Sequence, residues 1–457
     1  MGNRLVNTTL GGIALGSDGA VDGPFGSNLP ASAYTESGYP IIRGSNLSIG
    51  LDDFKDHEFV YVPEDAFQRL SRSECIAGDI IFTKKGTLGQ TGLLCTHHRF
   101  DRYLLSSNQM RLRVDTSKAL PEYVYYWVSS QSAINKLIKD SECTGVPKIN
   151  LAYLKSFPIS LPNLDAQKKI INVLGALNKK ITLNRQINQT LEQMAQALFK
   201  SWFVDFDPVI DNALDAGFFE QDIAFPDELL RRAEARRAVR ERGDFKPLPE
   251  AIRQLFPAAF EECAEPSLGL GGWVPKGWSV CKLENLMELA YGKALKSTDR
   301  IDGHVPVYGS GGITGYHNEP LVDGPSIIVG RKGTVGSLYW EDRPFFPIDT
   351  VFYVRSEKPL TYCFSLLQTL GLTEMNTDAA VPGLNRNNAY RLQVITPNDD
   401  VLNAFDTFAA TLRKRIFAHT EQIKNLTNLR DTLLPKLISG ELRLDNIEAD
   451  LTTEEVA

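Results

Sequence analysis

The chain has 457 residues, more than one hydrophobic core usually organises, so we expect two or more domains. Its 43% hydrophobic and 23% charged residues are ordinary for a soluble globular protein, and no apolar run approaches the roughly 20 residues of a membrane-spanning helix. A formal net charge of -7 excludes a protein that coats nucleic acid by bulk attraction, but it is compatible with a local DNA-binding surface. Since the N-terminus has no signal-peptide pattern, we expect a cytoplasmic protein without membrane partners.

Cysteine and histidine patterns argue against a metal site. The six cysteines have no C-x-x-C spacing, which excludes the usual zinc and disulfide frameworks, so we expect buried free thiols. No H-E-x-x-H motif occurs, and the pair His97-His98 is predicted to lie in a surface turn. We therefore expect no metal and no other cofactor.

Residues 1–161, the first module, have the pattern of short strands separated by turns. Apolar and polar residues alternate over residues 109–114, which predicts a half-buried strand. Residues 80–82 form a short apolar run that enters a glycine-containing turn at Lys84-Lys85-Gly86. A helix is predicted after Pro121, with its tyrosines in the core rather than on a base-stacking surface. The class is α+β.

The next segment, residues 165–202, predicts a long helix. Its apolar residues recur at alternating spacings of three and four, and only Asn184 and Asn188 interrupt them. Near the C-terminus residues 402–433 have the same spacing, with His419 and Arg430 as interruptions. Apolar residues at this spacing form a stripe along one side of a helix, which is typical of helices that pack together. We therefore expect the two helices to form an antiparallel coiled coil.

The length of such a helix has a geometric consequence. About 38 residues rise about 57 Å at 1.5 Å per residue. That length exceeds the roughly 34 to 36 Å between equivalent points one DNA turn apart. A pair of such helices with one module at each end would space two recognition domains along DNA.

Residues 205–272 belong to neither repeat. Within them residues 227–242 are helix-forming and rich in arginine. A basic helix of this kind could contact nucleic acid or an acidic partner. The interpretation we favour is a solvated helix in a long connector, with its arginines paired to its own glutamates.

Residues 273–396, the second module, repeat the first. Lys84-Lys85-Gly86-Thr87 returns as Arg331-Lys332-Gly333-Thr334, and Val146-Pro147-Lys148-Ile149-Asn150 returns as Val381-Pro382-Gly383-Leu384-Asn385. A Pro-Asn pair and a long helical pattern follow each copy. The fold expected is therefore two similar α/β domains separated by two long helices, with a pseudo-twofold internal repeat.

The domain boundaries follow from these patterns. We expect a first domain at 1–161, a first spacer helix at 162–204, a connector at 205–272, a second domain at 273–396, a second spacer helix at 397–440 and an acidic tail at 441–457.

The ends of the two helices carry a family resemblance. Residues 198–208 have the sequence LFKSWFVDFDP, and residues 429–442 have the sequence LRDTLLPKLISGEL. The second module opens on Val274-Pro275-Lys276-Gly277-Trp278 and continues to Tyr291-Gly292-Lys293. In these motifs, and in the order of its parts, the chain resembles the specificity subunit of type I restriction-modification enzymes over nearly its whole length. The opening at residues 11–26 and the long connector depart from the family pattern.

The resemblance implies a function. In that family each module is a target recognition domain for one half of a split double-stranded DNA sequence. The helices space the halves and dock the modification (methyltransferase) subunits and, in the complete enzyme, the restriction subunits. The specificity subunit is not itself catalytic.

Two absences agree with a non-catalytic subunit. The sequence contains neither a G-x-x-x-x-G-K-[ST] phosphate loop nor an Asn-Pro-Pro-aromatic motif, so we expect the chemistry to come from partners. Two alternatives stay open at this point. One is a self-contained DNA methyltransferase or nuclease, and the other is a structural coiled-coil scaffold.

Three loops in each module are candidates for DNA contact, because they carry cations, hydroxyls or amides that can bind phosphates or base edges. In the turns at 84–87 and 331–334 a glycine also allows the backbone to approach closely. Residues 43–46 and their expected counterpart 308–311 form one pair of loops. For each loop an ordinary solvated turn is the competing interpretation. The candidate DNA-binding residues are Arg43, Ser45, Asn46, Lys84, Lys85, Thr87, Lys148 and Asn150 in the first module, and Tyr308, Ser310, Arg331, Lys332, Thr334, Asn385, Arg386 and Asn387 in the second.

Overall fold

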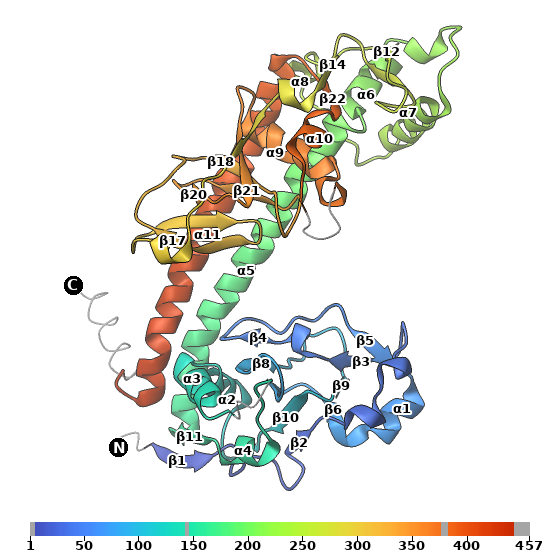
Figure 1. The fold of residues 1–457 in the computed structure, drawn as a ribbon. Helices are drawn as coiled ribbons and strands as arrows, with labels where there is room; N and C mark the ends of the chain where they lie inside the picture. The colour runs from blue at the N-terminus through green and yellow to red at the C-terminus, as the bar shows by residue number, and fades with distance from the viewer. Residues whose placement is uncertain (1–4, 142–145, 376–382, 443–457) are drawn as a thin grey trace, which may run out of the picture. The chain divides into compact units, whose positions relative to one another are not determined.

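The computed structural model describes residues 5–141, 146–375 and 383–442. Its contacts divide the chain into two compact units. Unit one comprises Met1–Arg185 and Glu421–Ala457, and unit two comprises Gln186–Thr420. Figure 1 draws the two long helices, α5 (Leu164–Phe203) and α11 (Asp399–Ser439). By residue number, each helix has part of its length in either unit. No helix in the described ranges is long and apolar enough to cross a membrane.

The largest sheet of unit one has five antiparallel strands in the order β2-β10-β7-β8-β4. Their bounds are β2 (Ala20–Asp22), β4 (Ser48–Ile49), β7 (Asp79–Thr83), β8 (Gln90–Leu93) and β10 (Gln109–Arg113). The central strand β7 is buried at every residue, with Ile80 and Phe82 in one hydrophobic cluster and Ile81 in another. Both faces of this sheet are therefore covered.

The half-buried character predicted for residues 109–114 is consequently wrong, although the strand itself is present as β10. Gln109 and Arg111, which the alternation assigned to solvent, are 2% and 4% exposed. Arg111 Nη1 donates to the backbone oxygen of Glu74 and Nη2 donates to that of Asp18, so two of its three nitrogens have partners inside the protein.

Smaller sheets and short helices complete unit one. A four-stranded sheet has the order β5-β3-β9-β6, in which β3 and β9 are parallel, and β1 pairs with β11. The bounds are β1 (Val6–Thr9), β3 (Tyr39–Ile42), β5 (Val60–Val62), β6 (Glu74–Cys75), β9 (Tyr103–Leu105), β11 (Pro158–Leu161), α1 (Glu64–Arg69), α2 (Pro121–Val128), α3 (Gln131–Lys139) and α4 (Leu151–Ser156). The tyrosines of α2 are buried, as the sequence predicted.

Unit two repeats this plan. Its sheets have the orders β15-β21-β18-β19, β17-β16-β20 and β14-β22, and β16 and β20 are parallel, like β3 and β9. The bounds are β14 (Ser279–Lys282), β15 (Glu288–Tyr291), β16 (Val305–Gly309), β17 (Gly312–His317), β18 (Ser326–Gly330), β19 (Leu338–Glu341), β20 (Phe346–Pro347), β21 (Val351–Arg355), β22 (Gln393–Thr396), α9 (Leu360–Thr369) and α10 (Arg386–Tyr390). The shared strand order confirms the predicted internal repeat of two α/β domains.

The two long helices are antiparallel in both units. In unit one Asn184 Nδ2 donates to Gln422 Oε1 at 3.2 Å, and in unit two Asn188 Nδ2 donates to Thr420 Oγ1 at 3.1 Å. The asparagines that interrupt the apolar stripe therefore have polar partners on the other helix. Each helix begins one residue after an asparagine cap, since Asn163 Oδ1 accepts from Ala166 N and Asn398 Oδ1 accepts from Val401 N.

The connector is part of the core of unit two. It contains α6 (Asp207–Asp215), α7 (Asp227–Arg240), α8 (Glu250–Arg253) and β12 (Phe260–Glu262), and β12 pairs with β13 (Trp273–Pro275). Leu229 and Ala233 of α7 are buried in the same hydrophobic cluster as Trp202 at the end of α5. The predicted helix at 227–242 is present, but it is packed against the protein rather than solvated on all sides.

An ion-pair ladder joins α6 to α7. Three aspartates and three arginines, each spaced by four residues, form the shortest pairs: Asp207 with Arg232, Asp211 with Arg236 and Asp215 with Arg240. Longer contacts of 3.9 Å join Arg236 to Asp207 and Arg240 to Asp211. Our expectation that these arginines pair with glutamates of their own helix is therefore wrong. Burial acts to lower the pKa of Arg236, but the hydrogen bonds to Asp211 and the negative charges of Asp211 and Asp207 together outweigh it, so the pKa is raised.

The ladder predicts a difference between two neighbouring arginines. Arg236 donates two hydrogen bonds to Asp211, at 2.9 and 2.7 Å, whereas Arg237 is exposed. Arg236→Gln should lower the free energy of unfolding by about 2 kcal/mol, because the buried carboxylate of Asp211 loses both of its charged hydrogen bonds from Arg236. Arg237→Gln should change it by less than about 0.5 kcal/mol. Urea denaturation measures both, and equal effects would contradict the ladder.

Candidate nucleic-acid interface

In unit one, the turn after β7 is held by backbone hydrogen bonds to two other segments. Lys84 N donates to Asn108 O at 2.8 Å, and Ile149 N donates to Lys84 O at 2.9 Å. Gly86 N donates to Pro147 O at 3.1 Å, with Gly86 at a φ of 107°, a conformation that favours glycine. Two of the three loops predicted from the sequence, 84–87 and 148–150, are therefore in contact.

The turn after β18 in unit two has the same backbone frame. Arg331 N donates to Thr350 O at 2.9 Å, and Leu384 N donates to Arg331 O at 2.8 Å. Gly333 has a φ of 86°, close to that of Gly86. Val381 and Pro382 of the repeated motif lie outside the described residues. The repeated sequence thus encodes a repeated arrangement of loops.

The cations of these turns have different surroundings in the two modules. Lys84 Nζ lies 3.1 Å from Asp22 Oδ1, whereas the Arg331 guanidinium lies over the ring of Tyr291, with Cζ 4.9 Å from the ring centroid. Arg331 Nη1 also donates to Asp349 O at 2.9 Å. The side chains that follow in each turn, Lys85, Thr87, Lys332 and Thr334, are exposed and able to meet a ligand.

The remaining loop pair is aligned differently from our expectation. Ser106 N donates to Ile42 O, and Ile348 N donates to Tyr308 O, so the equivalent of Tyr308 is Ile42 rather than Arg43. The parallel strand pairs give the same register. Matching Arg43 with Tyr308 was wrong by one residue, because the glycines of the two loops were aligned instead of the strands before them.

Two candidates in these loops have buried, hydrogen-bonded side chains. Asn46 is 1% exposed, accepts from Arg43 N and donates to the backbone oxygens of Lys55 and His57. Tyr308 is 6% exposed and donates to Glu341 Oε2 at 2.8 Å. Burial, with the neighbouring carboxylate, raises the pKa of Tyr308. We assign Asn46 and Tyr308 to holding their loops rather than to touching DNA.

The other residues of these loops are better placed for a ligand. Ser45 is exposed, and Arg43 is partly exposed with Nη2 donating to Glu58 O. Ser310 joins two loops, since its Oγ accepts from Thr334 N at 3.4 Å and its backbone oxygen accepts from Ser337 Oγ at 2.6 Å. The loops at 308–311 and 331–334 are therefore also brought together.

The asparagines of the third loop pair act as helix caps. Asn150 Oδ1 accepts from Tyr153 N at 2.8 Å at the start of α4, and Asn385 Oδ1 accepts from Asn387 N at 2.9 Å at the start of α10. Lys148 and Asn387 are exposed beside them. Arg386 lies over the ring of Tyr291, with Cζ 4.6 Å from the centroid.

Asp22 and Tyr291 were missed as site residues. They end the equivalent strands β2 and β15, and each meets the first cation of its own module. Sequence similarity between these two strands is slight, so only the register of the strands shows that they correspond. In the sequence Tyr291 belongs to the motif Tyr291-Gly292-Lys293, which gives no indication that its ring meets Arg331.

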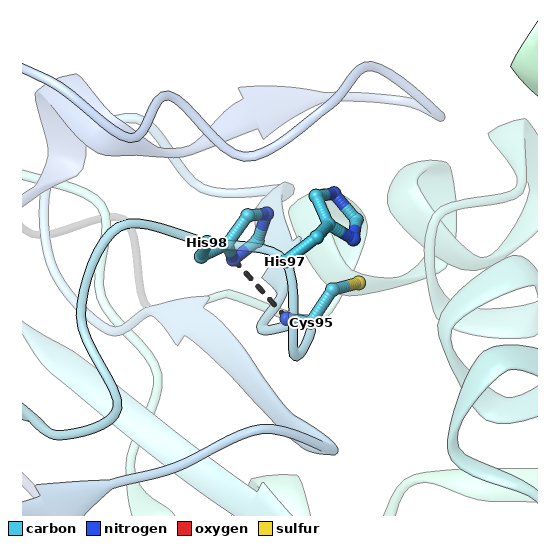
Figure 2. Close-up of side chains that lie close together, drawn as sticks. All are labelled: Cys95, His97 and His98. Atoms are coloured by element: carbon cyan, nitrogen blue, oxygen red, sulfur yellow. Dashed lines mark hydrogen bonds between the residues drawn. The ribbon is translucent and has the colours of Figure 1, made fainter.

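A cluster outside these loops brings together Cys95, His97 and His98 (Figure 2). Their donor atoms lie within 4.8 Å of one another, so the turn predicted for the histidines also has the proximity of a metal site. Burial raises the pKa of Cys95 to about 11 and lowers that of His98. The thiol is therefore protonated at neutral pH, and His98 Nδ1 accepts from Cys95 N at 3.1 Å. A metal ion would have to displace the thiol proton.

The geometry of the first loop predicts opposite roles for two adjacent side chains. Asn46→Ala should lower the free energy of unfolding by about 2 kcal/mol, since two backbone oxygens and one backbone N–H lose their partner. Ser45→Ala, at an exposed position, should leave unfolding within about 0.5 kcal/mol. Thermal or urea unfolding of both variants measures this, and a neutral Asn46→Ala would sink the structural assignment.

The chain is similar in sequence to a known protein family and to characterised members of it. A family model described as the type I restriction modification DNA specificity domain matches residues 36–193 and 275–398, more than half of the chain. The specificity subunit of the type I restriction enzyme HindI from Haemophilus influenzae is 26% identical over 407 residues, 80% of this chain and 86% of its own. That of MjaIX from Methanocaldococcus jannaschii is 23% identical over 407 residues, covering 86% of each chain.

A solved structure has a similar fold. The S subunit of a type I restriction-modification system from M. genitalium has a TM-score of 0.52 and 17% sequence identity. The match covers 95% of this chain and 96% of that one. At this identity the likeness concerns the fold alone.

Proposed function

Because the chain belongs to the type I restriction-modification DNA specificity family, we propose that it binds double-stranded DNA sequence-specifically, with each module contacting one half of a bipartite target. The observation that carries this proposal is that equivalent backbone hydrogen bonds hold the loops of both modules, while the side chains of those loops differ. Two sites built alike but lined differently suit two different half-sequences. The domains assigned to this task are residues 1–161 and 273–396.

The chain directs other subunits rather than performing catalysis. Modification (methyltransferase) subunits and restriction subunits are the proposed partners, in the cytoplasm, with the helices at 162–204 and 397–440 as spacers. The support is the specificity-subunit relatives, together with a sequence that lacks a phosphate loop and an Asn-Pro-Pro-aromatic motif. The connector at 205–272 packs into the core of unit two, which favours a structural role for it. The acidic tail proposed at 441–457 lies outside the described residues from residue 443 onward.

Methylation mapping tests the function. Cells that express the modification subunit with this chain should methylate a split DNA motif across the genome, and deleting the chain should remove that methylation completely. A genome whose methylation is the same with and without the chain would overturn the proposal. The purified chain alone, incubated with DNA and a methyl donor, should give no methylation, whereas turnover would favour a self-contained enzyme.

The exposed turn lysines should contact phosphates. A contact that neutralises one phosphate contributes about 0.9 to the slope of log K against log salt. Lys85→Ala and Lys332→Ala should each lower that slope by about 0.9, measured by DNA titration at several salt concentrations. Lys414→Ala, an exposed position on α11, is the control and should leave the slope unchanged. If the turn variants behave like the control, the lysines are merely solvated.

A further inference from the structure

Two arginines share one tyrosine ring in the second module. The guanidinium carbons of Arg331 and Arg386 lie 4.9 and 4.6 Å from the ring centroid of Tyr291, which is 48% exposed. The rings of Phe352 and Tyr390 extend the contact, each within 6 Å of one of the two guanidiniums. Stacking of this kind fixes the direction of a guanidinium and leaves its N–H groups available at the edge.

The charges of this cluster are not neutralised within the described part of the chain. Among those residues neither Arg331 nor Arg386 has a carboxylate within ion-pair distance. Among the described residues Arg386 Nε is buried and has no hydrogen-bond partner. Arg331 Nη1 donates a hydrogen bond to the backbone oxygen of Asp349. Two like charges against one ring repel each other, and burying an unpaired donor has a further cost. An anion between them would relieve both effects.

The first module has the same positions with different chemistry. Asp22 pairs with Met110, which stands opposite Phe82, whereas Tyr291 pairs with Phe352, which stands opposite Val329. The register therefore makes Asp22 the equivalent of Tyr291, just as Lys84 is the equivalent of Arg331.

The third position differs as well. Leu151 follows the cap Asn150, and Arg386 follows the cap Asn385. At these three equivalent positions the first module has one cation, which a carboxylate neutralises at 3.1 Å, and the second has two cations on a neutral ring.

We infer that Arg331, Arg386 and Tyr291 form a phosphate-binding site that only the second module possesses. The inference rests on the proposed function, since the phosphate that it would meet belongs to the DNA backbone. Guanidinium groups bind phosphate oxygens through paired N–H donors, and they do so more strongly where they are partly shielded from water. The first module then binds its half-site with fewer contacts to DNA phosphates, and the second module binds its half-site with more.

Salt dependence tests the inference with the full chain and its modification subunits. The probes are a duplex that carries the mapped target and an unrelated duplex of equal length. Arg386→Gln should lower the slope of log K against log salt by about 0.9 on both duplexes. Arg391→Gln removes an exposed arginine just beyond α10 and is the matched control, with no change in slope expected. Tyr291→Asp, which copies the first module, should also lower the slope, because the new carboxylate pairs with Arg331.

The outcomes separate this inference from the proposed function. A wild-type complex that prefers its target, together with an Arg386→Gln variant of unchanged slope, overturns the phosphate site and leaves the function standing. A variant that keeps its slope but changes its preference at one base pair makes Arg386 a base contact instead. A wild-type complex without sequence preference overturns both. Inorganic phosphate added at constant ionic strength should not displace the DNA, whereas displacement would assign the site to free phosphate. Thermal unfolding of each variant confirms that a change in slope does not come from unfolding.

Discussion

One backbone hydrogen bond in each module sets the frame on which the candidate interface depends. Ile149 N donates to Lys84 O in the first module, and Leu384 N donates to Arg331 O in the second. The bond brings the end of a central strand and the start of a short helix together, although they are far apart in sequence. Because only backbone atoms take part, the bond does not depend on the side chains at these positions, and either lysine or arginine can occupy the equivalent position.

Local periodicity explains why so much of the fold could be predicted. The three-and-four spacing along α5 and α11 depends only on neighbouring turns of one helix, and even its exceptions were informative, since Asn184 has a polar partner on the other helix. The internal repeat was visible because its turns need glycine at a positive φ, as at Gly86 and Gly333. Burial was harder to predict, because a second cluster covers the face of β10 that carries Arg111.

The details of the candidate interface depend on contacts between distant segments, which no local pattern contains. Asn46 resembled a DNA contact in sequence, but its hydrogen bonds to the backbone at residues 55 and 57 tie it into the loop. The correspondence of Asp22 with Tyr291 exists only in the strand register. In the connector the spacing of aspartates and arginines was present in the sequence, yet nothing local indicates that α6 lies beside α7.

The exchange of a carboxylate for a phenol at equivalent strand ends has an evolutionary consequence. Asp22 and Tyr291 both occupy strand positions whose ladder bonds are made by the backbone, so the side chain can change while the pairing stays. A single point substitution there alters the charge of one module by one unit and leaves the other module as it was. Affinity for one half of a target can thus drift independently, and new specificities can arise by small steps within a conserved architecture.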